Sequence, residues 1–328
     1  MKKVLLASTV LAMTATVAAA EVTVSGTARM GVAYNSEAPN ELGFTSRARV
    51  NFTMSGETDS GLSFGASFAA HDAGAANNGT GGDVNGAGSM SAGSVFVSGA
   101  FGKLTMGDVS GAAETVVGDL AGVGLTGLGD LNENVYLSNS NASRRAAALY
   151  EYTTGGLTFA LSADNPQTDT VLAVPAAPGV LPVAGTGSVG SVYSIGVKYA
   201  VDAYSFGLGY ESAKVYDSVT GTFTTIGHTI LGGEATFSGV TLKATYGEAS
   251  KLNFKQYGIS ASYTMDALTI AGYHRVEDFG AAGDVKFTGV GGSYDLGGGA
   301  SVVGGIVDVN PSVGTGETLA DLGLSFKF

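Results

Sequence analysis

The sequence predicts an all-β chain that closes into a transmembrane antiparallel β-barrel of about sixteen strands. Apolar and polar side chains alternate at every second position, as they do in strands with one face toward lipid and one toward water. Short turns and long loops alternate between these segments. The segment DLGLSFKF at the C-terminus places Leu322, Leu324, Phe326 and Phe328 on one face. Together these observations predict a water-filled pore in an outer membrane.

Residues 1–20 have the pattern of a secretory signal peptide. A basic Met-Lys-Lys start precedes an apolar run over 4–17, and an A-x-A cleavage site ends at Ala20. We therefore expect 1–20 to be cleaved and 21–328 to form a single barrel domain, exported to the bacterial outer membrane.

Composition excludes several classes of protein. Removing the two lysines of 1–20 leaves 14 basic against 28 acidic side chains, a formal charge of −14. This balance argues against nucleic acid as a partner, and it favours the passage or binding of cations over anions. Cysteine is absent, so stability must come from another source, such as a closed hydrogen-bond ladder. After residue 20 no stretch approaches the ~18 apolar residues of a membrane helix.

The strands are predicted in order from this alternation. The first, EVTVSGTARMGVAY, puts Val22 and Val24 on one face and Arg29 on the other; the second, FTSRARVNFTMSG, puts Arg47 and Arg49 on its polar face. These three arginines should point into the lumen. Comparable runs lie near 61–71, 91–100, 103–108, 146–153, 157–163, 191–200, 203–213, 226–237, 240–248, 253–265, 267–276, 284–295, 300–308 and 319–328.

The connections fall into two alternating kinds. Short turns carry Gly, Asp or Ser, as at Asp202, Ser238 and Asp266. Long loops lie near 35–42, 72–90, 109–145, 164–190, 214–225 and 309–318. Short periplasmic turns and long external loops are typical of outer-membrane barrels. A soluble β-sandwich is the alternative, but it would not need so many strands.

Tyrosines near strand ends are candidates for aromatic girdles at the two lipid-water interfaces, although β-propensity alone would also explain each one. They are Tyr34, Tyr150, Tyr152, Tyr199, Tyr204, Tyr210, Tyr246, Tyr263 and Tyr294.

The 109–145 connection is the longest and most acidic. With the preceding Asp108 it contains Glu114, Asp119, Asp130 and Glu133, and no Lys or Arg before Arg144. A loop of this length in a compact domain is usually functional. Folded into the lumen, its carboxylates would face the arginines of the first two strands across a narrowed channel. The alternative is an external loop whose acids face water.

The segments ARMGV, SRARV, FTMSG, TDSGL, GASF, SGAFGK, MGD, SYDLGGGAS, ADLG and the terminal FKF resemble the general diffusion porins of purple photosynthetic bacteria and their α-proteobacterial relatives. The resemblance runs from Glu21 to Phe328. It implies sixteen strands, a homotrimer and a third loop folded inward. It also places Arg29, Arg47 and Arg49 on the basic wall of the constriction, with the 109–145 loop opposite. His71 should add a titratable partial charge to that wall.

Calcium is considered at Asp130, Asn132 and Glu133, which begin like a calcium loop, although Val135 stands where an EF-hand needs glycine. Oxygen ligands in a folded loop could still hold calcium; no other cofactor is required. The segment 122–127 matches G-x-G-x-x-G, but neither the preceding strand nor the following helix of a dinucleotide site is predicted.

Three alternatives to a general pore are an enzyme, a plugged transporter and a substrate-specific channel, and the sequence favours none of them. His71, His228 and His274 lie on different predicted strands, and no G-x-S-x-G elbow accompanies them. A plugged transporter would need a separate N-terminal domain and more strands. A substrate-specific channel would need an aromatic track in the lumen, whereas most Tyr and Phe here face lipid.

We therefore expect a general diffusion porin that passes small hydrophilic solutes and ions passively. Its expected partners are two further copies of the chain, outer-membrane lipid and lipopolysaccharide.

Overall fold

A computed structural model describes residues 20–72, 89–90, 93–138, 146–164, 189–217 and 222–328. Its strands are β1 Glu21–Asn35, β2 Leu42–Glu57, β3 Ser63–Asp72, β4 Ser89–Met90, β5 Ser94–Gly99, β6 Gly102–Val109, β7 Ala146–Thr154, β8 Leu157–Ala163, β9 Val189–Val201, β10 Tyr204–Asp217, β11 Thr222–Phe237, β12 Val240–Ala249, β13 Phe254–Met265, β14 Leu268–Asp278, β15 Asp284–Gly297, β16 Ala300–Pro311 and β17 Glu317–Lys327. Its helices are α1 Ala112–Val117 and the 3₁₀ turns η1 Leu128–Asp130 and η2 Gly280–Ala282. In the described ranges, no helix has the length and apolar character needed to span a membrane. The predicted signal peptide lies outside the described residues, apart from Ala20.

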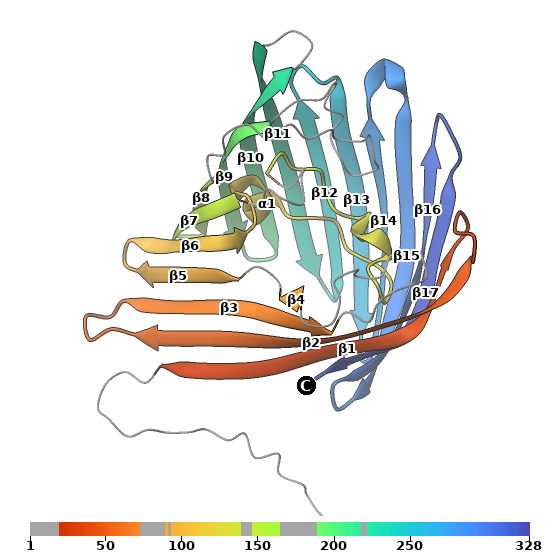
Figure 1. The fold of residues 1–328 in the computed structure, drawn as a ribbon, viewed down its shortest axis with the longest axis horizontal. Coiled ribbons are helices and arrows are strands. Elements are labelled where there is room, and N and C mark those ends of the chain that lie inside the picture. The colour runs from red at the N-terminus through yellow and green to blue at the C-terminus, as the bar shows by residue number, and fades with distance from the viewer. Residues whose placement is uncertain (1–19, 73–88, 91–92, 139–145, 165–188, 218–221) are drawn as a thin grey trace, which may run out of the picture.

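The strands form one closed antiparallel sheet (Figure 1). Apart from β4 and β5, each strand pairs with the next along the chain, and β17 returns to pair with β1, where Ala28 lies opposite Phe326. β4 and β5 both pair with β3, so together they make one strand of the barrel. The prediction of a closed antiparallel barrel of about sixteen strands is confirmed.

The apolar face of the strands points outward, as the alternation of apolar and polar residues predicts. Large apolar side chains on the outward face are exposed, among them Phe44, Val95 and Ile259. The predicted turn residues Asp202 and Ser238 adopt left-handed backbone angles, with φ of 49° and 50°. These residues reverse the chain between neighbouring strands, as tight hairpins require.

The packed core lies inside the barrel, between the inward face of the wall and the long β6–β7 loop. Loop residues Val116 and Tyr136 pack with Ile230 of β11 in one apolar cluster. Leu120 and Val123 pack with Phe287 of β15 in another. Where the loop covers the inward face, apolar side chains of the wall pack against it, which the alternation alone did not predict.

Candidate functional site

The β6–β7 loop enters the barrel, and α1 lies inside the ring of strands (Figure 1). The backbone amide of Ala112 donates to Ser162 Oγ on β8 at 2.8 Å, and that of Ala113 donates to Ser194 Oγ on β9 at 2.9 Å. Both alanines are fully buried. The first turn of α1 is thus bound to the wall by strand hydroxyls.

Glycines on the inward face of β10 let α1 approach at backbone distance. A Cβ on Gly207 would overlap the Val116 carbonyl oxygen, and a Cβ on Gly209 would lie 2.6 Å from Ala113 Cα. Some glycines of these strands are therefore needed for close packing against the loop, and not only for turns.

The middle of the loop is bound farther along the wall. The Ala121 amide donates to Ser260 Oγ on β13 at 3.0 Å. The Leu125 amide donates to Asp321 Oδ1 on β17 at 2.8 Å. At Gly124, with φ of 86°, a Cβ would lie 2.8 Å from that same oxygen. The segment matching G-x-G-x-x-G thus wraps around a carboxylate of the wall.

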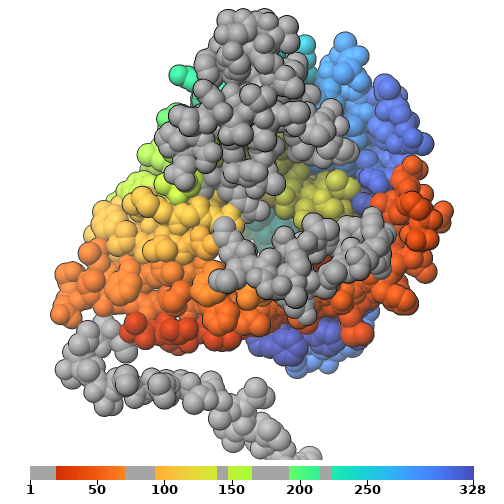
Figure 2. Space-filling view, in the orientation of Figure 1, coloured from red at the N-terminus to blue at the C-terminus, as the bar shows by residue number. Residues whose placement is uncertain are grey.

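The end of the loop, residues 135–138, is held by Glu211 of β10 and Gln256 of β13. The described loop therefore covers wall strands from β8 to β17. Figure 2 shows a hollow between this loop, in olive, and the orange strands, through which part of the far wall is visible in teal.

Four of the five predicted acidic residues come together. Glu114, Asp119, Asp130 and Glu133 line one hollow of about 290 Å³. Asp119 accepts a hydrogen bond from the Asn134 amide at 2.8 Å. Burial raises the pKa of the Asp119 carboxyl above its usual value, against the opposing effects of the Asn134 hydrogen bond and nearby cationic side chains.

The basic side lies next to this hollow. Arg29 and Arg47 are opposite each other on β1 and β2, and both line a second hollow of about 330 Å³. Arg29 Nη1 lies 3.4 Å from the Thr126 carbonyl oxygen. Asp130 lines both hollows, so it stands between the acidic side of the loop and the arginines.

The other predicted residues lie farther off. Arg49 follows Arg47 on the same face of β2 and pairs with Thr27, and Asp108 lies at the end of β6; neither lines the two hollows. His71 is opposite Arg49 in the β2–β3 register, but its side chain is outside the described part.

Sequence reasoning missed the wall residues that hold the loop. Glu211, Gln256, Arg275 and Asp321 are all buried, and all face inward. Arg275 donates through Nε to the Leu131 carbonyl oxygen at 3.1 Å and lines the acidic hollow. A polar side chain on the inward face of a strand was the available signal, but alternation cannot tell water from a loop as its neighbour.

The expected calcium ligands remain partly engaged with the loop itself. Asn132 Nδ2 donates to the Leu120 carbonyl oxygen at 2.8 Å, and the Glu133 amide donates to the Asp130 carbonyl oxygen at 3.0 Å. Across the described ranges, no group of three or more His, Cys, Asp or Glu side chains could hold a metal ion. Calcium binding at these residues stays a prediction.

The histidines considered for catalysis lie apart. His228 is fully buried between Glu211 and Gln256. His274 faces outward on β14, with Nδ1 2.8 Å from Thr288 Oγ1.

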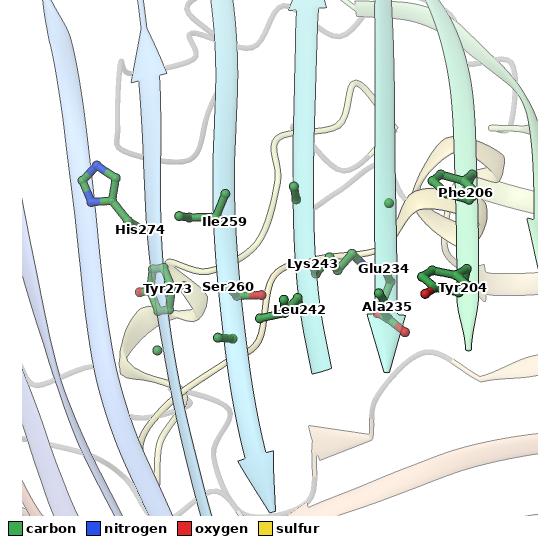
Figure 3. Close-up of a pocket in the computed structure, with 14 residues that line it drawn as sticks. Tyr204, Phe206, Glu234, Ala235, Leu242, Lys243, Ile259, Ser260, Tyr273 and His274 are labelled. Atoms are coloured by element: carbon green, nitrogen blue, oxygen red, sulfur yellow. The ribbon is translucent and has the colours of Figure 1, made fainter. Parts of the chain in front are cut away.

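A further groove of about 680 Å³ crosses β10–β14 on the outer surface (Figure 3). Exposed Phe206, Leu242 and Ile259 border it, and His274 lies at one end. Because these exposed side chains belong to the outward face, the groove lies across the wall from the lumen and has no part in the constriction.

Comparison with known proteins identifies the architecture. A model of the Gram-negative porin family matches residues 7–311. A porin of Rhodobacter capsulatus is 37% identical over 340 aligned residues, which cover 94% of this chain and all of that protein. A porin structure refined at 1.8 Å resolution matches with a TM-score of 0.72 and 36% identity, over 94% of this chain and all of the other. A triple mutant of Rhodopseudomonas blastica porin has a TM-score of 0.67 at 19% identity, with the same coverage, a likeness of fold alone.

Proposed function

This chain belongs to the Gram-negative porin family, and from that premise we propose how solutes cross the barrel. It is an outer-membrane general diffusion porin, through which small hydrophilic solutes pass down their gradients. The narrowest part of the path runs between the loop carboxylates and the arginines of β1 and β2. Opposed charges there orient dipolar solutes and exclude apolar ones, which cannot replace the ordered water.

The observation that carries this proposal is the position of Asp130. It lines the acidic hollow together with Glu133 and the basic hollow together with Arg29 and Arg47. Charges of opposite sign therefore face one another across a short distance, the positive ones on wall strands β1 and β2 and the negative ones on a loop that is bound to the wall. A transverse field at this level follows from that arrangement.

The test is ion selectivity in a planar bilayer with a salt gradient. Arg29→Ala with Arg47→Ala should raise the cation preference and admit bulkier solutes. Removing one positive charge at about 6 Å changes the energy of an ion by roughly 0.7 kcal/mol in a water-like dielectric, about threefold in the local concentration of that ion. Because the energies of cations and anions change in opposite directions, the ratio of the two changes by about tenfold. Asp130→Asn with Glu133→Gln should shift the reversal potential the other way. Lys286→Ala, at a half-exposed lysine outside the constriction, is the control. Unchanged reversal potentials in both double variants would refute the constriction.

We propose that the chain forms a homotrimer and that one arc of the wall makes the contacts between its copies. Apart from Tyr34, the outward tyrosines of the described strands all lie on β7–β15. They are Tyr150, Tyr152, Tyr193, Tyr199, Tyr204, Tyr210, Tyr246, Tyr257, Tyr263 and Tyr294. On β16, β17, β1, β2, β3, β5 and β6 the large apolar side chains on the outward face are otherwise aliphatic residues, methionine or phenylalanine. An apolar arc with a single outward tyrosine suits contact with further copies better than contact with two lipid-water interfaces.

Two matched variants test that arc. Val50→Arg on β2 and Leu208→Arg on β10 each place an arginine on the outward face near mid-strand, where the cost in lipid is similar. Only Val50→Arg should reduce the assembly from three chains to one, as measured by light scattering in detergent. If only the Leu208→Arg variant dissociated, the interface would lie on the opposite arc instead.

We also propose that residues 1–20 are removed on export. The mass of the membrane-bound protein tests this proposal.

A further inference from the structure

Three buried polar side chains of the wall meet beneath the end of the loop. Glu211 of β10, His228 of β11 and Gln256 of β13 are each 0% exposed. The Glu211 carboxylate accepts from the Leu137 amide at 2.7 Å and from the Ser138 hydroxyl at 2.7 Å. His228 Nδ1 lies 2.9 Å from Glu211 Oε2. These contacts bind loop and wall in one network.

Gln256 binds the loop through both ends of its amide. Its Oε1 accepts from the Val135 amide at 2.8 Å, and its Nε2 donates to the Val135 carbonyl oxygen at 2.7 Å. The orientation of the Gln256 amide is therefore determined by the loop backbone. The nitrogen is also the atom that faces His228 Nε2, at 3.1 Å.

This arrangement requires neutral His228. Because Gln256 Nε2 is a donor only, His228 Nε2 must accept, and the ring proton must sit on Nδ1 to donate to Glu211. A second proton would place two N–H groups face to face. Rotating the Gln256 amide would remove that clash, but it would break both bonds to Val135. A protonated His228 and a bound Val135 are thus mutually exclusive.

In the described surroundings, few other titratable groups face His228. The titratable groups facing His228 are Glu211 from β10 and Tyr136 of the loop, whose ring centroid is 6.3 Å away. Burial first, and then the nearby carboxylates, raise the pKa of Tyr136 well above its usual value, so Tyr136 stays neutral. β12 offers Gly247, where a Cβ would lie 2.9 Å from His228 Nε2, and β13 offers uncharged Gln256.

We propose that Glu211, His228 and Gln256 are the positioning residues of the constriction, which hold 135–138 against the wall only while His228 is neutral. Protonation of His228 releases this segment. Since the wall lies on its other side, the segment can move only into the lumen, where it obstructs the pore. This inference rests on the proposed function, and it adds an acid response to it.

Single-channel recording between about pH 7.5 and about pH 4.5 tests the proposal. The unmodified protein should show stepwise closures in acid, with the ratio of closed to open times rising by up to about tenfold per pH unit, as for one linked proton. His228→Gln, which cannot be protonated in this range, should lose the acid closures, so that its ratio of closed to open times no longer changes with pH. His274→Gln is the matched control, because His274 faces outward, and it should keep them.

The outcomes separate the two proposals. Absence of conductance at neutral pH would refute the proposed function. Normal conductance without acid closures in the unmodified protein, or closures that persist in His228→Gln, would overturn the positioning role. If His228→Gln fails to insert, Gln256→Met provides the second variant, because it loses both bonds to Val135 and should close at neutral pH. Titration of the loop carboxylates gives only a graded change in conductance, which all variants share.

Discussion

Asp321 of β17 binds Thr126 of the loop through both the backbone and the side chain. Its Oδ2 accepts from the Thr126 amide at 2.6 Å and from the Thr126 hydroxyl at 2.7 Å. The two residues are 195 positions apart, and Asp321 is 6% exposed. β17 also closes the barrel on β1. The position of the loop in the channel therefore depends on the last strand being in place.

Replacing Asp321 by asparagine should loosen the loop. Asn keeps one acceptor oxygen, but it loses the charge and places an N–H₂ group toward an amide donor. Hydrogen bonds to charged groups contribute about 1.5–3 kcal/mol each, so we expect a loss of roughly that size in the free energy of unfolding, and noisier current. Urea unfolding in detergent and single-channel recording measure these effects. Asp295→Asn, at an exposed position, should change neither.

Gly209→Ala should displace α1 from the wall. The added Cβ would lie 2.6 Å from Ala113 Cα, and a backbone atom cannot turn away as a side chain can. Overpacking of this kind costs about 1–3 kcal/mol, and displacing α1 toward the lumen should lower conductance. Gly233→Ala on the next strand meets Phe206 at 3.4 Å, an ordinary contact. Equal conductance in the two variants would show that α1 does not set the pore width.

Cation preference should decline in acid because of Asp119. Burial raises the pKa of its carboxyl, so as pH falls Asp119 takes up a proton before an exposed aspartate does. The negative charge is present above the raised pKa and lost below it. Reversal potentials measured from neutral pH downward should show the decline beginning above the ordinary aspartate value of 3.8. In Asp119→Asn, that early part of the decline should be missing.

Calcium should bind the loop weakly through Asp130 and Glu133, which share the acidic hollow. Carboxylate oxygens suit this cation, and its charge would oppose that of the loop. Adding calcium should therefore lower the cation preference, and chelation should restore it. Asp130→Asn should abolish the response. A response that survives in this variant would place the ion elsewhere.

The candidate site could be predicted in part. The arginines of β1 and β2 followed from alternation, because a charged side chain on a lipid-facing strand must point inward. The acids of the loop followed from length and charge. The grouping of Glu114, Asp119, Asp130 and Glu133 apart from Asp108 did not, because it depends on the path of the chain between them. His228 was weighed only as a catalytic residue, since nothing in its neighbourhood along the chain indicates Glu211 or Gln256.

The sequence by itself determined the barrel, its strand directions and the faces of its side chains, because a strand's two-residue period is local and lipid requires one apolar face throughout. Only the tertiary structure decided which inward residues meet water and which meet the loop. Ile230 and Phe287 are apolar inside the barrel because α1 and the segment after it cover them. Those contacts join residues more than a hundred positions apart, through hydrogen bonds and close packing that no local pattern encodes.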